Sequence, residues 1–218
     1  MLYVQYNNLV VEAKGIYSVE KFLMARRFMY WQVYLHKTSL AAEQLLIRII
    51  RRARQLILDG KLQCNAPSLA YFLRQSASQN GFSRESLEQF ALLDDVDILA
   101  ALKQWQQESE PVLSALCEMI LDRRLVSIKI RDTPVSEDRI QKKTKQFREL
   151  TGFSEEEASY FVFAGEISNR TYSQESQILM LEKNGRVSDV AAHSAHLNLE
   201  SLSETQTMYY ICYPKKWV

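Results

Sequence analysis

The segment KFLMARRFMYWQVYLHK at residues 21–37 decides how this sequence is interpreted, because it is the densest run of aromatic and basic side chains in the chain. The helical pattern begins just before it, with Ser18 as the predicted N-cap. Apolar residues then recur at helical spacing, namely Phe22, Ala25, Phe28, Met29 and Trp31. The spacing predicts a helix over residues 18–35.

A stripe of polar groups follows one face of this predicted helix. Arg26, Tyr30 and Tyr34 are spaced four residues apart, and Lys37 extends the stripe by nearly one turn. A guanidinium fork, two phenols and an ammonium suit a polyphosphate ligand with a base or sugar to stack on. The alternative is an amphipathic helix whose aromatic rings are core and whose cations snorkel to water. The pattern alone favours this alternative.

The rest of the chain changes character near residue 124. Before it, helices are predicted at 38–59, 67–75, 84–92, 94–107 and 110–122, punctuated by Gly60, Pro67, Asp94 or Asp95, and Pro111. After it, a helix is predicted at 136–151 and strands at 126–131, 160–168, 177–183 and 206–213, with an Asn-Gly hairpin within 177–189. Residues 8–14 are predicted to form a strand or an extended arm. We therefore expect a mostly α fold, with a helical part at 1–124 and a smaller α+β subdomain at 125–218.

Composition excludes several classes of protein. The 218 residues carry a formal charge of +1 and only six glycines, so neither a nucleic-acid-binding field nor a glycine-rich phosphate loop is indicated. No apolar run is long enough to span a membrane, and no signal peptide is predicted. Cys64, Cys117 and Cys212 form no CxxC pair and suit reduced thiols. We expect a cytoplasmic protein with no membrane partner and no specific nucleic-acid partner.

Metal and nucleophile motifs are scarce. The HxxH pair of His193 and His196 has no acidic residue at a helpful spacing, and a surface turn explains it better than a metal site. The sequence has no HExxH, no His-Asp dipeptide and no GxSxG. We therefore predict no metal site and no complete catalytic set in this chain.

Two runs of basic residues could be read either as an anionic-ligand surface or as solvated helix faces. One comprises Arg48, Arg51, Arg52 and Arg54, and the other comprises Lys142, Lys143, Lys145 and Arg148. They could mark an anionic surface, but acidic residues lie nearby in the sequence. We therefore expect solvated helix faces.

The stretch LVVEAKGIYSVEKFLMARRFMYWQVYLHKT at residues 9–38 resembles the HD-domain phosphohydrolases related to deoxynucleoside triphosphate triphosphohydrolases, including the SAM-and-HD-domain dNTPases. Looser support comes from FALLDDVDILAALKQW at 90–105, ILDRRL at 120–125 and MYYICYPKK at 208–216. The resemblance implies part of an HD-phosphohydrolase-like helical bundle.

Hydrolysis in that family depends on a divalent metal held by two His and two Asp, which include an adjacent His-Asp pair. The ligands lie upstream of the segment that this sequence resembles. His36 falls in the YLHK motif and not at a ligand position. The resemblance therefore implies the C-terminal half of such an enzyme, without metal or cofactor in this chain, as a truncated, split or degenerate form.

Residue by residue, the resemblance implies a substrate site. Arg26 matches the arginine that contacts the triphosphate, and Tyr34 matches the tyrosine that packs on the substrate sugar. Tyr30 stands where the mammalian enzyme has a histidine.

The resemblance also implies an effector site. Lys14, His36 and Lys37 match positions that line the activator-nucleotide site of regulated members, whereas Glu12 replaces an arginine there.

Three hypotheses follow for the chain. It is the nucleotide-contacting and oligomerising part of a (deoxy)nucleoside triphosphate phosphohydrolase, a non-catalytic nucleotide-binding or assembly module, or a plain helical scaffold. In the family, the neighbours of helix 18–35 cover it within the catalytic bundle. We therefore expect Phe22, Phe28, Met29 and Trp31 to be exposed here and a homo-oligomer to form.

Overall fold

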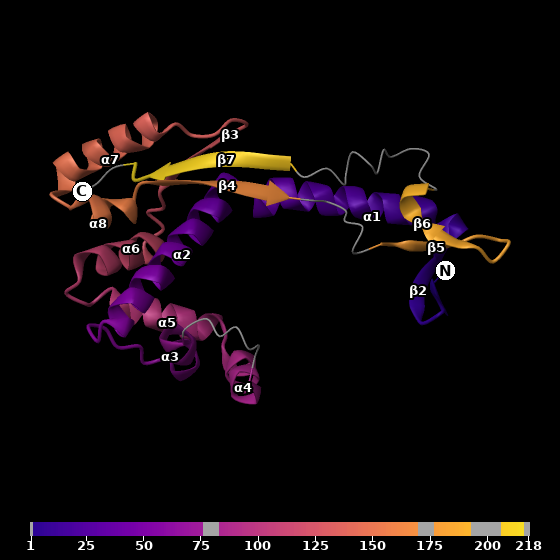
Figure 1. Cartoon of the computed structure of the whole chain (residues 1–218), viewed down its shortest axis with the longest axis horizontal. Coiled ribbons are helices and arrows are strands. Elements are labelled where there is room, and N and C mark those ends of the chain that lie inside the picture. Colours follow the sequence, from indigo (N-terminus) through magenta and orange to yellow (C-terminus); the bar gives the residue numbers. More distant parts are fainter. Residues whose placement is uncertain (1, 76–82, 170–176, 193–205, 216–218) are drawn as a thin grey trace. The chain divides into compact units, whose positions relative to one another are not determined.

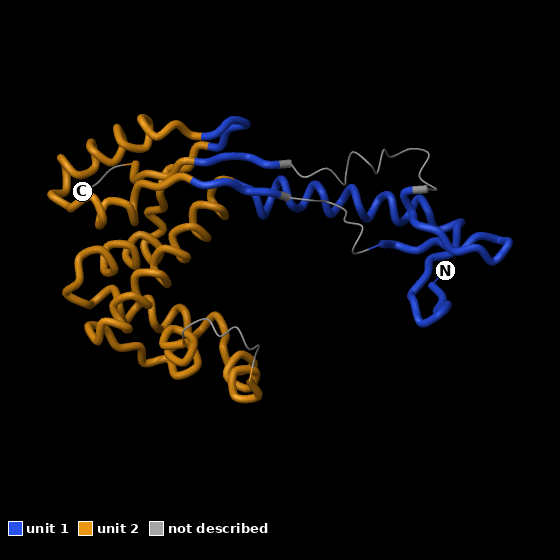
Figure 2. The backbone as a smooth tube through the Cα atoms, in the orientation of Figure 1, with its two compact units in different colours: residues 1–36, 130–134, 165–210 blue, residues 37–129, 135–164, 211–218 orange. Residues whose placement is uncertain are grey.

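A computed structural model describes residues 2–75, 83–169, 177–192 and 206–215 of the chain (Figure 1). The described part is mostly helical and carries two small sheets, which confirms the predicted fold class. Contacts divide the chain into two compact units (Figure 2). Unit 1 comprises residues 1–36, 130–134 and 165–210, and unit 2 comprises residues 37–129, 135–164 and 211–218. The chain passes repeatedly between these units, whereas the division expected between residues 124 and 125 is linear and stays a prediction.

The helices of unit 2 begin and end at residues that the sequence marks. They are α2 (Lys37–Leu58), α3 (Pro67–Arg74), α4 (Arg84–Leu92), α5 (Asp95–Trp105), α6 (Pro111–Leu121), α7 (Glu137–Thr151) and α8 (Glu155–Ser159). Proline occupies the first turn of α3 and of α6, and the Asp94 carboxylate caps α5. Gly60 and Gly152 adopt positive φ angles of 70° and 76° just after α2 and α7, where a side chain would be strained.

The core of unit 2 lies along one face of α2. Leu45 and Ile49 on that face are fully buried, and α2 packs against α3 and α6. Leu113 of α6 and Trp105 of α5 are also fully buried. The Trp105 indole donates a hydrogen bond to the Gln63 carbonyl at 3.1 Å, which satisfies its buried polar group. Unit 2 therefore has a closed apolar core.

Unit 1 is a small sheet packed on one helix. Its elements are β1 (Leu2–Gln5), β2 (Asn8–Glu12), η1 (Ala13–Gly15), α1 (Ile16–Met29), the π-helix η2 (Tyr30–Tyr34), β5 (Leu179–Leu181), β6 (Val187–Asp189) and η4 (Val190–Ala192). The strand order is β1-β2-β5-β6, with β2 parallel to β5 and the other pairs antiparallel. Val19, Leu23, Met180 and Val190 form its core. The hairpin predicted over 177–189 is confirmed.

The second sheet has the order β3-β7-β4. Its strands are β3 (Ser127–Arg131), β4 (Phe163–Asn169) and β7 (Gln206–Tyr213). Each strand runs from one unit into the other. A close approach occurs at Gly165, where a Cβ atom would lie 2.5 Å from the Tyr210 Oη atom. Only glycine fits there without movement of the buried Tyr210 ring.

Three local features differ from the sequence-based expectations. Ser18 lies inside α1, whose N-cap is Gly15, because η1 already carries the chain into helical geometry. The hairpin β1–β2 turns through Tyr6 and Asn7, both with positive φ, and β1 was not predicted. The short helix α8 was not predicted either, although a capping box at Ser154 begins it.

The predicted helix 18–35 is not α-helical throughout. Residues 30–34, in η2, form a π-helix, in which the Leu35 backbone N–H donates to the Tyr30 carbonyl at 2.7 Å. The helix then ends, and Lys37 is the first residue of α2, in unit 2. Lys37 is therefore not part of a continuous helical stripe with Arg26, because the turn at Leu35 and His36 interrupts the helix.

Candidate functional site

The three predicted substrate-binding residues lie together in unit 1. The Arg26 guanidinium is 5.4 Å from the Tyr30 ring centroid, and the Tyr30 and Tyr34 ring centroids are 5.2 Å apart with an interplanar angle of 52°. Arg26 and Tyr34 are exposed, whereas Tyr30 is half-buried. The one-turn spacing across the junction of α1 and η2 brings these side chains into a row, which we call the Arg26 stack.

The chemistry of the Arg26 stack suits an anionic ligand with a flat or sugar-like part. Within the described part of the chain, no carboxylate forms an ion pair with Arg26, so its planar fork is available to phosphate oxygens. The Tyr30 ring holds the guanidinium by a cation–π contact. The exposed Tyr34 ring offers a stacking face and a hydroxyl.

The predicted effector residues Lys14, His36 and Lys37 do not form one cluster within a unit. The Lys14 ammonium pairs with the Glu12 carboxylate at 2.9 Å, and this hydrogen bond raises the pKa of Lys14 above its ordinary value. His36 lies in the turn after η2, where its backbone N–H donates to the Val33 backbone carbonyl at 3.3 Å. Lys37 belongs to unit 2.

Lys37 lines a groove of about 710 Å³ in unit 2. The groove is basic, because Arg123, Arg124 and Lys215 also line it. Arg124 is neutralised by ion pairs with Glu118 and, at 3.2 Å, with Asp122. The other three cations have no ion pair among the described residues, so the groove is suited to an anion. The sequence does not reveal this groove, because its walls lie about 90 to 180 residues apart in the chain.

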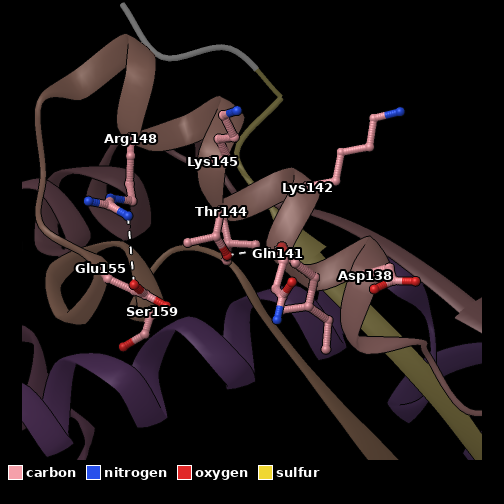
Figure 3. A pocket seen from close by; sticks show the side chains of 10 residues that line it. Asp138, Gln141, Lys142, Thr144, Lys145, Arg148, Glu155 and Ser159 are labelled. Atoms are coloured by element: carbon pink, nitrogen blue, oxygen red, sulfur yellow. Dashed lines mark hydrogen bonds and ion pairs between the residues drawn. The ribbon is translucent and has the colours of Figure 1, made fainter.

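A second groove, of about 750 Å³, follows α7 and α8 (Figure 3). Two of its three cations are paired, since Arg148 pairs with Glu155 at 3.7 Å and Lys145 pairs with Glu149 at 4.0 Å, whereas the exposed Lys142 has no ion pair among the described residues. The Thr144 hydroxyl donates to the Ile140 carbonyl at 3.0 Å, within α7 itself. Lys142, Lys145 and Arg148 therefore lie on a solvated helix face, as expected for the later basic run, whereas Lys143 is half-buried against the Tyr213 ring.

The earlier basic run is less solvated than predicted. Arg48 and Arg52 are half-buried, with their guanidinium groups 4.1 Å and 5.3 Å from the Phe163 and Tyr160 ring centroids. Arg52 also pairs with Glu110 at 2.7 Å. Burial lowers the pKa of Arg52, but the hydrogen bond and charge of Glu110 outweigh this effect. The expectation of a solvated face is wrong for these two residues, which join α2 to its neighbours.

No metal-binding cluster of three or more His, Cys, Asp or Glu side chains occurs among the described residues. His193 and His196 lie outside the described residues, so the HxxH prediction is not tested. Cys64, Cys117 and Cys212 are free and buried. Burial raises the pKa of Cys117 and of Cys212 to about 12, which keeps both thiols protonated. The described side chains therefore do not fit the divalent metal that the resemblance implies.

Comparison with known proteins places these features in context. Residues 1–66 match a family described as an HD associated region. A phosphohydrolase from Bacteroides thetaiotaomicron has a solved structure that is similar with a TM-score of 0.84 and 39% identity, over 99% of this chain and 54% of that chain. The uncharacterized protein YwfO of Bacillus subtilis is 28% identical over 96% of this chain and 47% of its own length.

A hypothetical protein from Aquifex aeolicus shares the fold alone, with a TM-score of 0.53 and 21% identity over 98% of this chain and 46% of that chain. The chain thus spans about half the length of the relatives it matches. Residues 1–66 are similar to an HD associated region, and the chain has the fold of part of the Bacteroides phosphohydrolase. In the part of the chain that the structure describes, no helix has the length and apolar character needed to cross a membrane.

Proposed function

We propose that this chain is the C-terminal, HD-associated part of a phosphohydrolase acting on (deoxy)nucleoside triphosphates, to which it contributes phosphate contacts and an assembly interface. The single observation that carries the proposal is the Arg26 stack, in which a guanidinium without an ion pair among the described residues lies beside two tyrosine rings. The match of residues 1–66 to the HD associated region supports it, because this range contains the whole stack.

In this proposal the Arg26 guanidinium binds the triphosphate and offsets charge that develops on it. Tyr34 supports the sugar, and Tyr30 holds Arg26 in place through the 5.4 Å contact. Because the described side chains do not fit a divalent metal, no hydrolytic step is assigned to them. A metal-activated water would be the contribution of the HD part.

An assembly role is supported by the outward face of α1. Phe22, Phe28 and Met29 are about half exposed, as expected, whereas Trp31 is half-buried. Leu2, Val4 and Leu9, on one face of the β1–β2 hairpin, are 64–74% exposed. Apolar patches of this kind mark interaction sites. We propose that a second copy of the chain covers this surface when the HD part is absent.

The basic groove at Lys37 favours a second candidate function, a non-catalytic nucleotide-binding module. Lys37, Arg123 and Lys215 line it, and none of them has an ion pair within the described residues. This arrangement supports an effector role for Lys37 in phosphate binding. Lys14 and His36 remain proposed effector contacts from unit 1.

Titration calorimetry with dGTP and dATP tests the substrate assignment. Arg26→Gln removes the fork and should raise the dissociation constant about tenfold. The matched control is Arg27→Gln, which changes the neighbouring arginine and should leave the affinity within about twofold. If Arg26→Gln binds dGTP as the unchanged chain does, the Arg26 stack is not the substrate site.

Lys37→Gln separates the two candidates. A loss of affinity in Lys37→Gln, with Arg26→Gln unaffected, would favour the binding module over the substrate role. We expect no turnover of dGTP by the 218-residue chain with Mn²⁺. Turnover that a chelator abolishes would overturn the assignment of the metal to another part of the enzyme.

A further inference from the structure

Two lysine side chains lie beside one phenol in unit 2. Tyr213 lies at the end of β7, and β3 is its neighbour in the sheet. The Lys143 ammonium, from α7, is 4.5 Å from the Tyr213 ring centroid, and the Lys129 ammonium, from β3, is 6.0 Å from it. Three elements that are distant in sequence thus converge on one tyrosine side chain.

This cluster is not neutralised by acidic side chains. Lys143 donates to the Gln146 side-chain carbonyl at 3.2 Å, which is an uncharged partner. Neither Lys129 nor Lys143 has an ion pair with a carboxylate of the described residues. By contrast, Lys145, two residues further along α7, pairs with Glu149. The two ammonium groups at Tyr213 therefore carry an uncompensated local charge, which attracts anions.

The phenol responds to these cations. Burial raises the pKa of Tyr213. Hydrogen bonds with Lys129 and Ser127 and the charges of Lys129 and Lys143 lower it by more, so the pKa lies below its ordinary value. The Tyr213 hydroxyl is a hydrogen-bond group beside the two lysines. The site thus combines two cations with two hydroxyls.

We infer that the ammonium groups of Lys129 and Lys143 and the hydroxyls of Tyr213 and Ser127 form a binding site for a phosphate group. Ammonium groups supply charge, and hydroxyls supply hydrogen bonds to the remaining oxygens of a tetrahedral oxyanion. Ser127 also lines the basic groove at Lys37, so the site lies beside that groove. The inference does not depend on the proposed function, because no residue of the Arg26 stack takes part.

The pH dependence of binding follows from the phenol. The charged groups that bear on the Tyr213 hydroxyl are Lys129 from β3 and Lys143 from α7. Deprotonation of Tyr213 places a negative charge between these cations and competes with the anion. Binding should therefore weaken as the pH rises through the pKa of Tyr213. Tyr213→Phe should lower the affinity at neutral pH, because the hydroxyl is lost, and should abolish this weakening at high pH.

Carbon-13 NMR of labelled tyrosine ring carbons tests the site in the full chain, with Tyr213→Phe assigning the resonance. Inorganic phosphate and pyrophosphate are added in one arm and dGTP in the other. We expect either anion source to shift the Tyr213 resonance and to raise its pKa, since a bound anion offsets the lysines. A shift with dGTP alone assigns the site to nucleotide phosphates, and a shift with inorganic phosphate assigns it to the free anion as well.

Variants at the lysines complete the test. Lys129→Gln and Lys143→Gln should each weaken phosphate binding about tenfold and raise the pKa of Tyr213 toward its ordinary value. The matched control, Lys145→Gln, should change binding by less than about twofold. The inference is overturned if no anion shifts the Tyr213 resonance, or if both lysine variants bind phosphate as tightly as Lys145→Gln.

Discussion

The helices α1 and α2 follow one another in the chain but differ in how they use their apolar residues. α2 buries one face, including Leu45 and Ile49, and exposes charged residues such as Arg51 on the other. α1 buries Val19 and Leu23 but also exposes Phe22 and Phe28. The apolar face of an amphipathic helix such as α2 is covered by other helices of its own unit. A helix that is apolar on both faces, such as α1, is expected to have both faces covered.

This difference extends to the two regions around the helices. In unit 2, the fully buried side chains of α2, α5 and α6 form a closed core. In residues 2–34 of unit 1, eleven large apolar or aromatic side chains are exposed, from Leu2 to Tyr34. Unit 2 also exposes large apolar side chains, among them Leu87, Phe90 and Val96 at α4 and α5, but α2 and the helices packed on it share a closed core. The first strands and helix of unit 1 bury few of their apolar side chains and present a surface for another polypeptide.

Alanine substitutions in α2 and in α1 test this difference directly, and they have the largest expected effect on the free energy of unfolding. Ile49→Ala leaves a cavity in the closed core and should lower the free energy of unfolding by about 2–5 kcal/mol. Phe22→Ala removes a half-exposed ring and should lower it by less than about 0.5 kcal/mol in a dilute, monomeric sample. Urea unfolding measures both. Similar losses for the two variants would show that α1 is already covered within its own chain.

A glycine substitution tests how tightly the rest of unit 1 is packed. In Gly165→Ala the new Cβ atom would lie 2.5 Å from the Oη atom and 2.7 Å from the Cζ atom of Tyr210. Because the ring is buried, we expect a loss of about 1–3 kcal/mol in the free energy of unfolding. In the background of Tyr210→Leu the same substitution should cost less than about 0.5 kcal/mol. An equal cost in both backgrounds would contradict the close approach.

The cysteines report on the closure of unit 2, which contains all three. The folded pKa of Cys117 and Cys212 is about 12, above the ordinary value of 9.0. The unfolded chain therefore loses these protons first, and the associated stability is full below pH 9.0 and falls between pH 9.0 and about pH 12.

Thiol labelling and unfolding measure this effect. We expect slow labelling by a disulfide reagent at pH 8 in the folded chain, and rapid labelling after denaturation. Cys117→Ala with Cys212→Ala should make the alkaline loss of stability smaller. Rapid labelling of the folded chain would show that the core of unit 2 opens.

Much of the helical part could be predicted from the sequence, because local signals fix it. Pro67, Pro111 and the capping Asp94 mark helix starts, and Gly152 marks a helix end. The hairpin over 177–189 was predicted from its Asn-Gly pair, and Gly185 adopts a φ of 82° there. These features depend on residues that are close in sequence.

The missed elements lack such signals. The β1–β2 turn places Tyr6 at a φ of 50°, which is uncommon for a bulky residue and gives no turn motif. The π-helix at 30–34 changes the hydrogen-bond spacing from four residues to five, which apolar spacing does not show.

The candidate sites also divide into one that local spacing predicted and two that it did not. The row of Arg26, Tyr30 and Tyr34 was predicted, because residues one helical turn apart meet. The basic groove and the Tyr213 cluster were not, because their residues come from distant elements such as α2, β3 and β7. Long-range contacts are set by packing and not by local spacing.

Light scattering of the purified chain tests the central claim, that the surface of residues 2–34 is made to be covered. The account predicts a mass of at least two chains, and a monomer for the double variant Phe22→Lys with Phe28→Lys. The control is Leu150→Lys, which changes an even more exposed apolar residue, in unit 2, and should leave the association intact. A monomeric unchanged chain, or association that survives the double variant and is lost in the control, would contradict the account.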